Sequence, residues 1–163
     1  MLADTIRQFY NYHFAMNKFI WHQFVVPLTQ EEFERPVAYS VGSVHNHIVH
    51  LINVDFSWFH DLIGEEPPEW RTPEEMNDRD TIRTWWDDVI AFQRARLADL
   101  TDEQAMSHPM QGEDSSIAVW QVLLHVANHA TDHRAQILRA IHDMGYETMP
   151  QDYVFYLYDI NGK

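Results

Sequence analysis

Four long segments of this chain carry apolar side chains at steps of three and four residues, which is the period of an α-helix. They cover residues 3–26, 40–64, 82–97 and 115–145. The chain has only five glycines and almost no β-branched residues in the alternating pattern of a strand. An aromatic tail, YVFYLYDINGK, follows the last segment. The sequence therefore predicts an all-α fold, a four-helix bundle with long connections and an aromatic C-terminal tail.

Residues that favour helix ends mark the limits of these segments. Pro27 ends the first, Ser40 is a good N-cap for the second, and Gly64 suits its C-terminus. The fourth segment has a serine pair at its start and Gly145 at its end. We find no internal repeat, low-complexity tract or domain boundary, so we expect residues 1–163 to form a single domain.

Charge and composition exclude several classes of function. The formal net charge of −14 repels phosphate backbones and anionic lipid surfaces, so neither nucleic acid nor a membrane is expected as a partner. No apolar run approaches the roughly 18 residues that span a bilayer, and residues 1–20 lack the apolar core of a signal peptide. We therefore expect a cytoplasmic protein. Because the chain has no cysteine, only His, Asp and Glu remain as strong metal ligands.

Three histidines follow one another at a spacing of four in the fourth segment: His125, His129 and His133, in HVANHATDHRAQ. Positions four apart differ by about 40° around a helix axis, so neighbouring imidazoles can reach one ion. With 11 histidines in the chain, chance accounts for part of this pattern. The stripe flanks the apolar face of the helix, which indicates a seam between helices.

A pair of ligands on one helix normally needs a third from another element. The second segment offers His45, His47 and His50 in SVHNHIVHLINVD. This helix is apolar over much of its girth, so periodicity alone leaves all three open as the third ligand.

Other histidine and nucleophile chemistries do not fit. The zinc-protease pattern needs Glu directly after the first histidine, but Val126 and Ala130 occupy those positions. A di-iron bundle needs Glu three residues before a histidine, and no histidine here has an acidic residue there. A G-x-S-x-G elbow is missing as well. Peptide hydrolysis, ferritin-like oxygen chemistry and nucleophilic triads are therefore not expected.

At this point the sequence resembles the DinB/YfiT-like family of four-helix bundles with a three-histidine site for a divalent metal. The resemblance rests on SVGSVHNHIVHLINVDFSW at 40–58, on VWQVLLHVANHATDHRAQILRAIHDMG at 119–145 and on PQD at 150–152. The most specific part is N-H-x-x-D-H-R-x-Q-I in the last helix.

The resemblance also implies which histidines bind the metal. In that family one ligand is a histidine several residues after a serine and eight before an aromatic residue, and Ser43, His50 and Trp58 fit this pattern. The other two ligands are then His129 and His133.

The remaining polar residues of these helices receive lesser roles. His125 is expected to be a neighbour of the site, and Trp58 is a candidate for the pocket mouth. Arg134 is expected either to bind a substrate carboxylate or, as the favoured alternative, to pair with an acidic residue of a helix in a structural role. The candidates for accepting a hydrogen bond from a ligand imidazole are Asn46, Asp55, Asn128 and Asp132.

Three imidazoles leave a divalent cation with an open coordination position, the arrangement of catalytic zinc sites. Imidazole ligands favour zinc or nickel. The resemblance implies a metal-dependent transferase or hydrolase acting on a small molecule, including transfer of low-molecular-weight thiols. The alternatives are a noncatalytic metal-binding or stress-response dimer with a structural metal, and a helical scaffold whose histidines bind nothing. The aromatic tail also suggests an interface, so a homodimer is expected.

Overall fold

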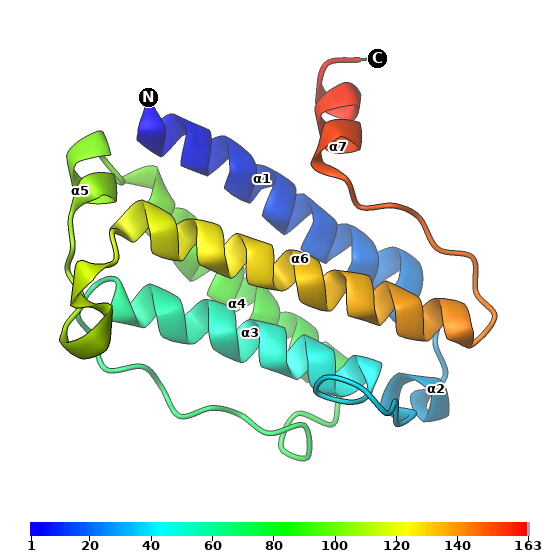
Figure 1. Ribbon diagram of the computed structural model, residues 1–163. Coiled ribbons are helices and arrows are strands. Elements are labelled where there is room, and N and C mark those ends of the chain that lie inside the picture. The colour runs from blue at the N-terminus through cyan, green and yellow to red at the C-terminus, as the bar shows by residue number, and fades with distance from the viewer. Residues whose placement is uncertain (163) are drawn as a thin grey trace.

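The computed structural model describes residues 1–162. Its long helices are α1 (Leu2–Ile20), α3 (Val44–Asp61), α4 (Arg79–Ala98) and α6 (Val119–Asp143). The shorter helical elements are η1 (Trp21–Val25), α2 (Gln30–Glu34), α5 (Asp102–Met106), η2 (Gly112–Ser116) and α7 (Tyr153–Ile160). Both α6 and α4 contact α1 and α3, so the four long helices close a ring around the core (Figure 1). Residues 1–162 contain no β-strand, which confirms the predicted all-α bundle.

The second helix begins later than its sequence suggested. Ser43, rather than Ser40, is the N-cap, and its side chain accepts a hydrogen bond from the backbone N–H of Asn46. Ser40 lies in the preceding turn with a φ of 52°. Gly42 in the same turn has a φ of 108°, a conformation that strongly favours glycine. Because Ser40 lies in this tight turn, it does not cap the helix, and the N-cap falls three residues later.

The fourth helix also begins later than expected. Instead of starting at the serine pair, the chain first forms the short 3₁₀ turn η2, and α6 starts at Val119. The Gln121 side chain accepts a hydrogen bond from the Ala118 backbone N–H at 2.8 Å. The C-terminal end of the helix agrees with the prediction: α6 ends at Asp143, and Gly145 follows with a φ of 95°.

The aromatic tail forms the helix α7, which packs onto α1. The ring of Tyr153 lies 5.2 Å from that of Phe9 and 5.0 Å from that of Tyr12, measured between centroids. Its outer face exposes apolar side chains: Val154, Phe155, Tyr158 and Ile160. The homodimer that the sequence suggested stays a prediction.

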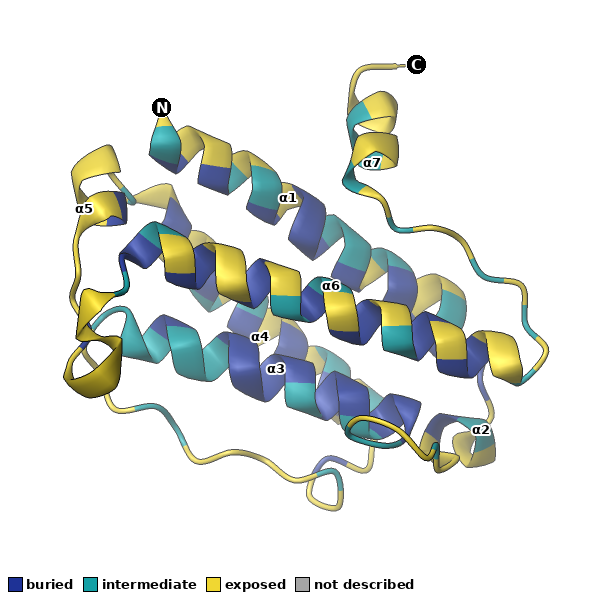
Figure 2. Ribbon diagram, viewed as in Figure 1, coloured by how far each residue is buried: buried dark blue, intermediate teal, exposed yellow. Residues whose placement is uncertain are grey.

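The buried sides of the four long helices face one another, as the dark stripes in Figure 2 show. One half of the core gathers around Ile48, Trp86 and Ile137, and the other around Tyr10 and Val126. No helix within residues 1–162 has both the length and the apolar character that crossing a bilayer requires.

Candidate metal centre

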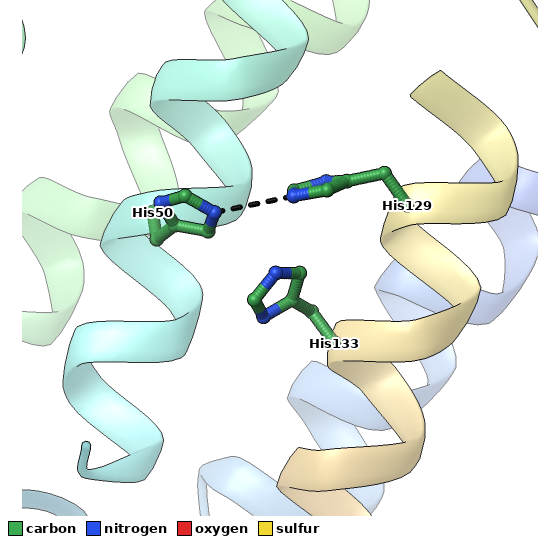
Figure 3. Close-up of side chains that lie close together, drawn as sticks. All are labelled: His50, His129 and His133. Carbon is green, nitrogen blue, oxygen red and sulfur yellow. Dashed lines mark hydrogen bonds between the residues drawn. The ribbon is translucent and has the colours of Figure 1, made fainter. Parts of the chain in front are cut away.

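The bundle brings three of the sequence-predicted histidines together, across the seam between α3 and α6. His50 comes from α3, and His129 and His133 come from α6, one turn apart (Figure 3). Each offers one ring nitrogen, and these nitrogens all lie within 4.8 Å of one another. The Nε2 atoms of His50 and His129 are 3.2 Å apart.

This geometry suits a small divalent cation. Around a tetrahedral zinc ion with Zn–N bonds of about 2.0–2.1 Å, two ligand nitrogens lie about 3.3 Å apart. The 3.2 Å between the Nε2 atoms of His50 and His129 is close to this value, and the nitrogen that His133 offers lies within 4.8 Å of both. The donor set is three imidazoles, which late first-row cations favour. The cluster is therefore compatible with a divalent metal site.

The environment keeps these imidazoles neutral, as metal binding requires. Burial, reinforced by the neighbouring His133 and His50, lowers the pKa of His129 to about 4. Burial also lowers the pKa values of His50 and His133 below the ordinary value of 6.5. At neutral pH each ring is therefore uncharged and keeps one nitrogen with a free lone pair, which a cation can use once the tautomers are arranged.

A fourth histidine stands directly behind the cluster. His47 is fully buried on α3, and its Nδ1 lies 2.9 Å from the Nδ1 of His133. In Figure 3 the other nitrogen of His133 points toward the pair formed by His50 and His129. The sequence left His47 open as a ligand but did not reveal this supporting position. His47 lies three residues before His50 and therefore on the same side of the helix. This spacing could have indicated that His47 lies next to the cluster.

Four polar residues were candidates for supporting the ligands through hydrogen bonds. These residues are Asn46, Asp55, Asn128 and Asp132. Across residues 1–162, none of them hydrogen-bonds to a histidine of the cluster. Asp55 is buried and its Oδ2 lies 3.2 Å from the Nε2 of His13. Asn46 bonds within the turn before α3, and the two α6 residues are exposed. None of the four candidates is therefore confirmed: Asn46 is satisfied locally, as short polar side chains often are, and Asp55 pairs with a residue of α1.

The other histidines of the two helices lie outside the cluster. The ring of His125 is 6.0 Å from that of His129 between centroids, and Trp58 packs on it edge-on at 5.4 Å. His45 stacks on Phe33 and its Nε2 lies 2.6 Å from a backbone carbonyl. His125 is therefore a neighbour, as expected, and His45 is a core residue.

Arg134 has a structural role, which was the favoured reading. It is only 1% exposed. Its guanidinium donates to Asn17 Oδ1 at 2.9 Å, Thr131 Oγ1 at 2.9 Å and Gln151 Oε1 at 2.8 Å, and lies 3.4 Å from His13 Nδ1. None of these partners is the helix acid that the sequence suggested. The side chain joins α1, α6 and the segment before α7, so it is not available to a substrate.

A cavity of about 330 Å³ opens beside the cluster. It is lined by His50 and by Trp70 and Pro73 of the connection between α3 and α4. A separate cavity of about 260 Å³ lies at the far end of α3 and α4, against Phe59 and Leu97, and no histidine of the cluster lines it. Of these two cavities, only the first is lined by a histidine of the cluster.

Comparisons with known proteins agree with this architecture. Protein DinB of Bacillus subtilis (strain 168) is 21% identical to this chain over 166 residues, and the alignment covers 96% of each protein. The model of the family described as "DinB family" matches residues 1–162. Because this match runs over practically the whole sequence, the chain belongs to the DinB family.

Proposed function

We propose that this protein is a metal-dependent enzyme that binds one divalent cation through His50, His129 and His133 and acts on a small molecule. The observation that carries the proposal is the convergence of three neutral imidazoles beside an accessible cavity. A fully protein-ligated structural site has no such opening. Zinc and nickel are the cations that the ligand set favours.

The reaction class we favour is transfer of a low-molecular-weight thiol, with hydrolysis as the second choice within the same site. A divalent cation with an open position supplies Lewis acidity, which lowers the pKa of a thiol or a water molecule. The protein's own contribution is to keep the three imidazoles uncharged and to hold them on two packed helices. His47 fixes the ring of His133 by its 2.9 Å contact.

The test has two parts. Elemental analysis of the protein from native expression identifies the cation, and a screen with thiols and electrophilic acceptors measures transfer. We expect His50→Ala and His129→Ala to lose both the bound cation and the transfer activity, whereas His142→Ala, on the exposed side of α6, keeps both. Stoichiometric cation in all three variants would rule out the proposed ligands. Full cation content without any transfer or hydrolysis would rule out the enzyme.

The alternative function is a noncatalytic metal-binding protein. What favours it is that the ligands tie α3 to α6, so a cation would also stabilise the bundle. Azide binding to the cobalt-loaded protein separates the two functions. A change in the cobalt absorption spectrum requires an open position, and an unchanged spectrum supports the structural role.

A further inference from the structure

Trp70 lies against His50 although it belongs to a long connection that is far from any helix end. It is 53% exposed, and its ring centroid is 5.6 Å from that of His50, at an interplanar angle of 67°. A tryptophan that stays half exposed gains only part of the stabilisation that full burial would give. Its position beside His50 therefore suggests a role other than filling the core.

Two side chains of α3 hold this part of the connection in place. The buried amide of Asn53 bonds both backbone groups of Arg71: its Oδ1 accepts from the Arg71 N–H at 3.0 Å, and its Nδ2 donates to the Arg71 carbonyl at 2.8 Å. The indole N–H of Trp70 donates to Ser57 Oγ at 2.8 Å. Spaced three and four residues apart, His50, Asn53 and Ser57 form one stripe along α3. The helix that supplies a candidate ligand therefore also positions the indole.

The cavity beside His50 offers apolar surface rather than free polar groups. Its walls include Val41, Val49 and Pro73 as well as Trp70. The amide of Asn53 is occupied by the backbone of the connection.

The other polar walls also have partners. The guanidinium of Arg71 lies 4.6 Å from the Trp85 ring centroid and 3.6 Å from Met76 Sδ. Asn46 donates to the Val41 carbonyl at 3.0 Å and accepts from Ser43 Oγ at 3.1 Å. Thr72 Oγ1 accepts from the Glu75 N–H at 3.3 Å. With these groups occupied, a ligand here would be recognised by its shape and apolar surface.

We propose that this cavity binds an aromatic ring of the small molecule, with Trp70 as its wall and a thiol on a short linker directed toward the histidine cluster. The volume of about 330 Å³ is at the small end of ligand pockets, roughly 300–1,000 Å³, which suits a single ring. Asn53 and Ser57 are positioning residues for Trp70. The thiol half of the proposal rests on the function proposed above, whereas the ring site exists in the protein without it.

The main test compares two thiols on the cobalt-loaded protein, with the charge-transfer absorption of the bound thiolate as the signal. The probes are benzyl mercaptan, which carries a ring, and ethanethiol, which does not. We expect Trp70→Ala to weaken benzyl mercaptan binding about 10-fold and to leave ethanethiol and cobalt affinity within about 2-fold. Met106→Ala removes an equally exposed apolar side chain from α5 and is the matched control, with no change expected.

The positioning role has its own control. Ser57→Ala removes the acceptor of the indole N–H, whereas Ser57→Thr keeps a hydroxyl there. We expect Ser57→Ala to lower the preference for benzyl mercaptan over ethanethiol and Ser57→Thr to restore it. Equal weakening of both thiols in Trp70→Ala, or no weakening of either, would overturn the proposal.

Failure of the metal site would be visible separately, because the wild-type protein would then show no cobalt absorption at all. In that case benzyl alcohol is titrated into the metal-free protein, and the indole N–H signals are followed by NMR. The signal that disappears in Trp70→Phe identifies Trp70. A saturable shift of this signal supports the ring site, and a signal that does not move overturns it.

Discussion

His47 and His133 face each other Nδ1 to Nδ1 at 2.9 Å across the seam between α3 and α6. A hydrogen bond between two such atoms needs the proton on one of them. If His133 gives its Nε2 lone pair to a cation, its Nδ1–H donates to His47, which must then carry its own proton on Nε2. That Nε2 is buried and has no hydrogen-bond partner within residues 1–162. The tautomers of the two rings are therefore coupled, at the cost of one unsatisfied donor on His47.

Replacing His47 should weaken cation binding without removing a ligand. In His47→Ala the His133 ring loses the acceptor that fixes its tautomer and orientation, so we expect the zinc affinity to fall by about 10- to 100-fold. Competition against a chromophoric chelator measures the affinity, and circular dichroism verifies the fold. His142→Ala is the control. An affinity within about 3-fold of wild type in a folded His47→Ala protein would contradict the supporting role.

The stability of the metal-free protein should fall on mild acidification. Burial, with the neighbouring His133 and His50, lowers the pKa values of His47 and His129 to about 4, whereas the unfolded chain takes up protons near 6.5. The stability from keeping these rings neutral is therefore complete above pH 6.5 and is lost as the pH falls toward 4. Urea midpoints in EDTA at pH 7.5 and pH 5 measure the loss. His129→Asn should lose less stability than the wild type between the two pH values. A loss equal to that of the wild type would show that other groups cause the acid sensitivity.

The sequence predicted the four long helices because each buries one periodic stripe. It also predicted the gathering of His50, His129 and His133, but spacing alone did not distinguish His50 from His45 and His47, and the family resemblance made that choice. The hydrogen bonds to the cluster were not predictable in the same way. They depend on which side chains meet across the seam, and local alternatives, such as those of Asn46, compete with them.

A side chain at Gly42 should destabilise the turn before α3. Its φ of 108° is strained for any other residue, and an added Cβ would lie 2.9 Å from the Asn46 amide nitrogen. Gly64 has a φ of 69° with open space around the added Cβ, so it isolates the backbone strain. We expect Gly42→Ala to cost about 2–3 kcal/mol of unfolding free energy and Gly64→Ala about 1 kcal/mol. Urea denaturation measures both, and equal costs would show that the Asn46 contact is unimportant.

Arg134 should matter for stability far more than its exposed neighbour on the same helix. Truncation to alanine leaves Asn17 and Gln151 without their charged donor, and we expect a loss of about 2–4 kcal/mol. Arg139 is exposed and pairs with Asp143, so Arg139→Ala should cost less than about 0.5 kcal/mol. Thermal unfolding of both variants, with limited proteolysis of the segment before α7, provides the comparison. Similar losses in the two variants would contradict a central role for the buried network.

Cation binding should stabilise the bundle, because its ligands come from two helices that meet only in the folded chain. At a free zinc concentration 100 times the dissociation constant, the gain is about 2.7 kcal/mol, or roughly 5–10 °C in unfolding temperature for a domain of this size. Calorimetry with zinc and with EDTA measures this difference for each variant. His50→Ala and His129→Ala should lose the gain. His125→Ala should keep it, because the His125 ring lies outside the cluster, 6.0 Å from that of His129. Loss in His125→Ala together with retention in His50→Ala would mean that the cation binds along α6 alone.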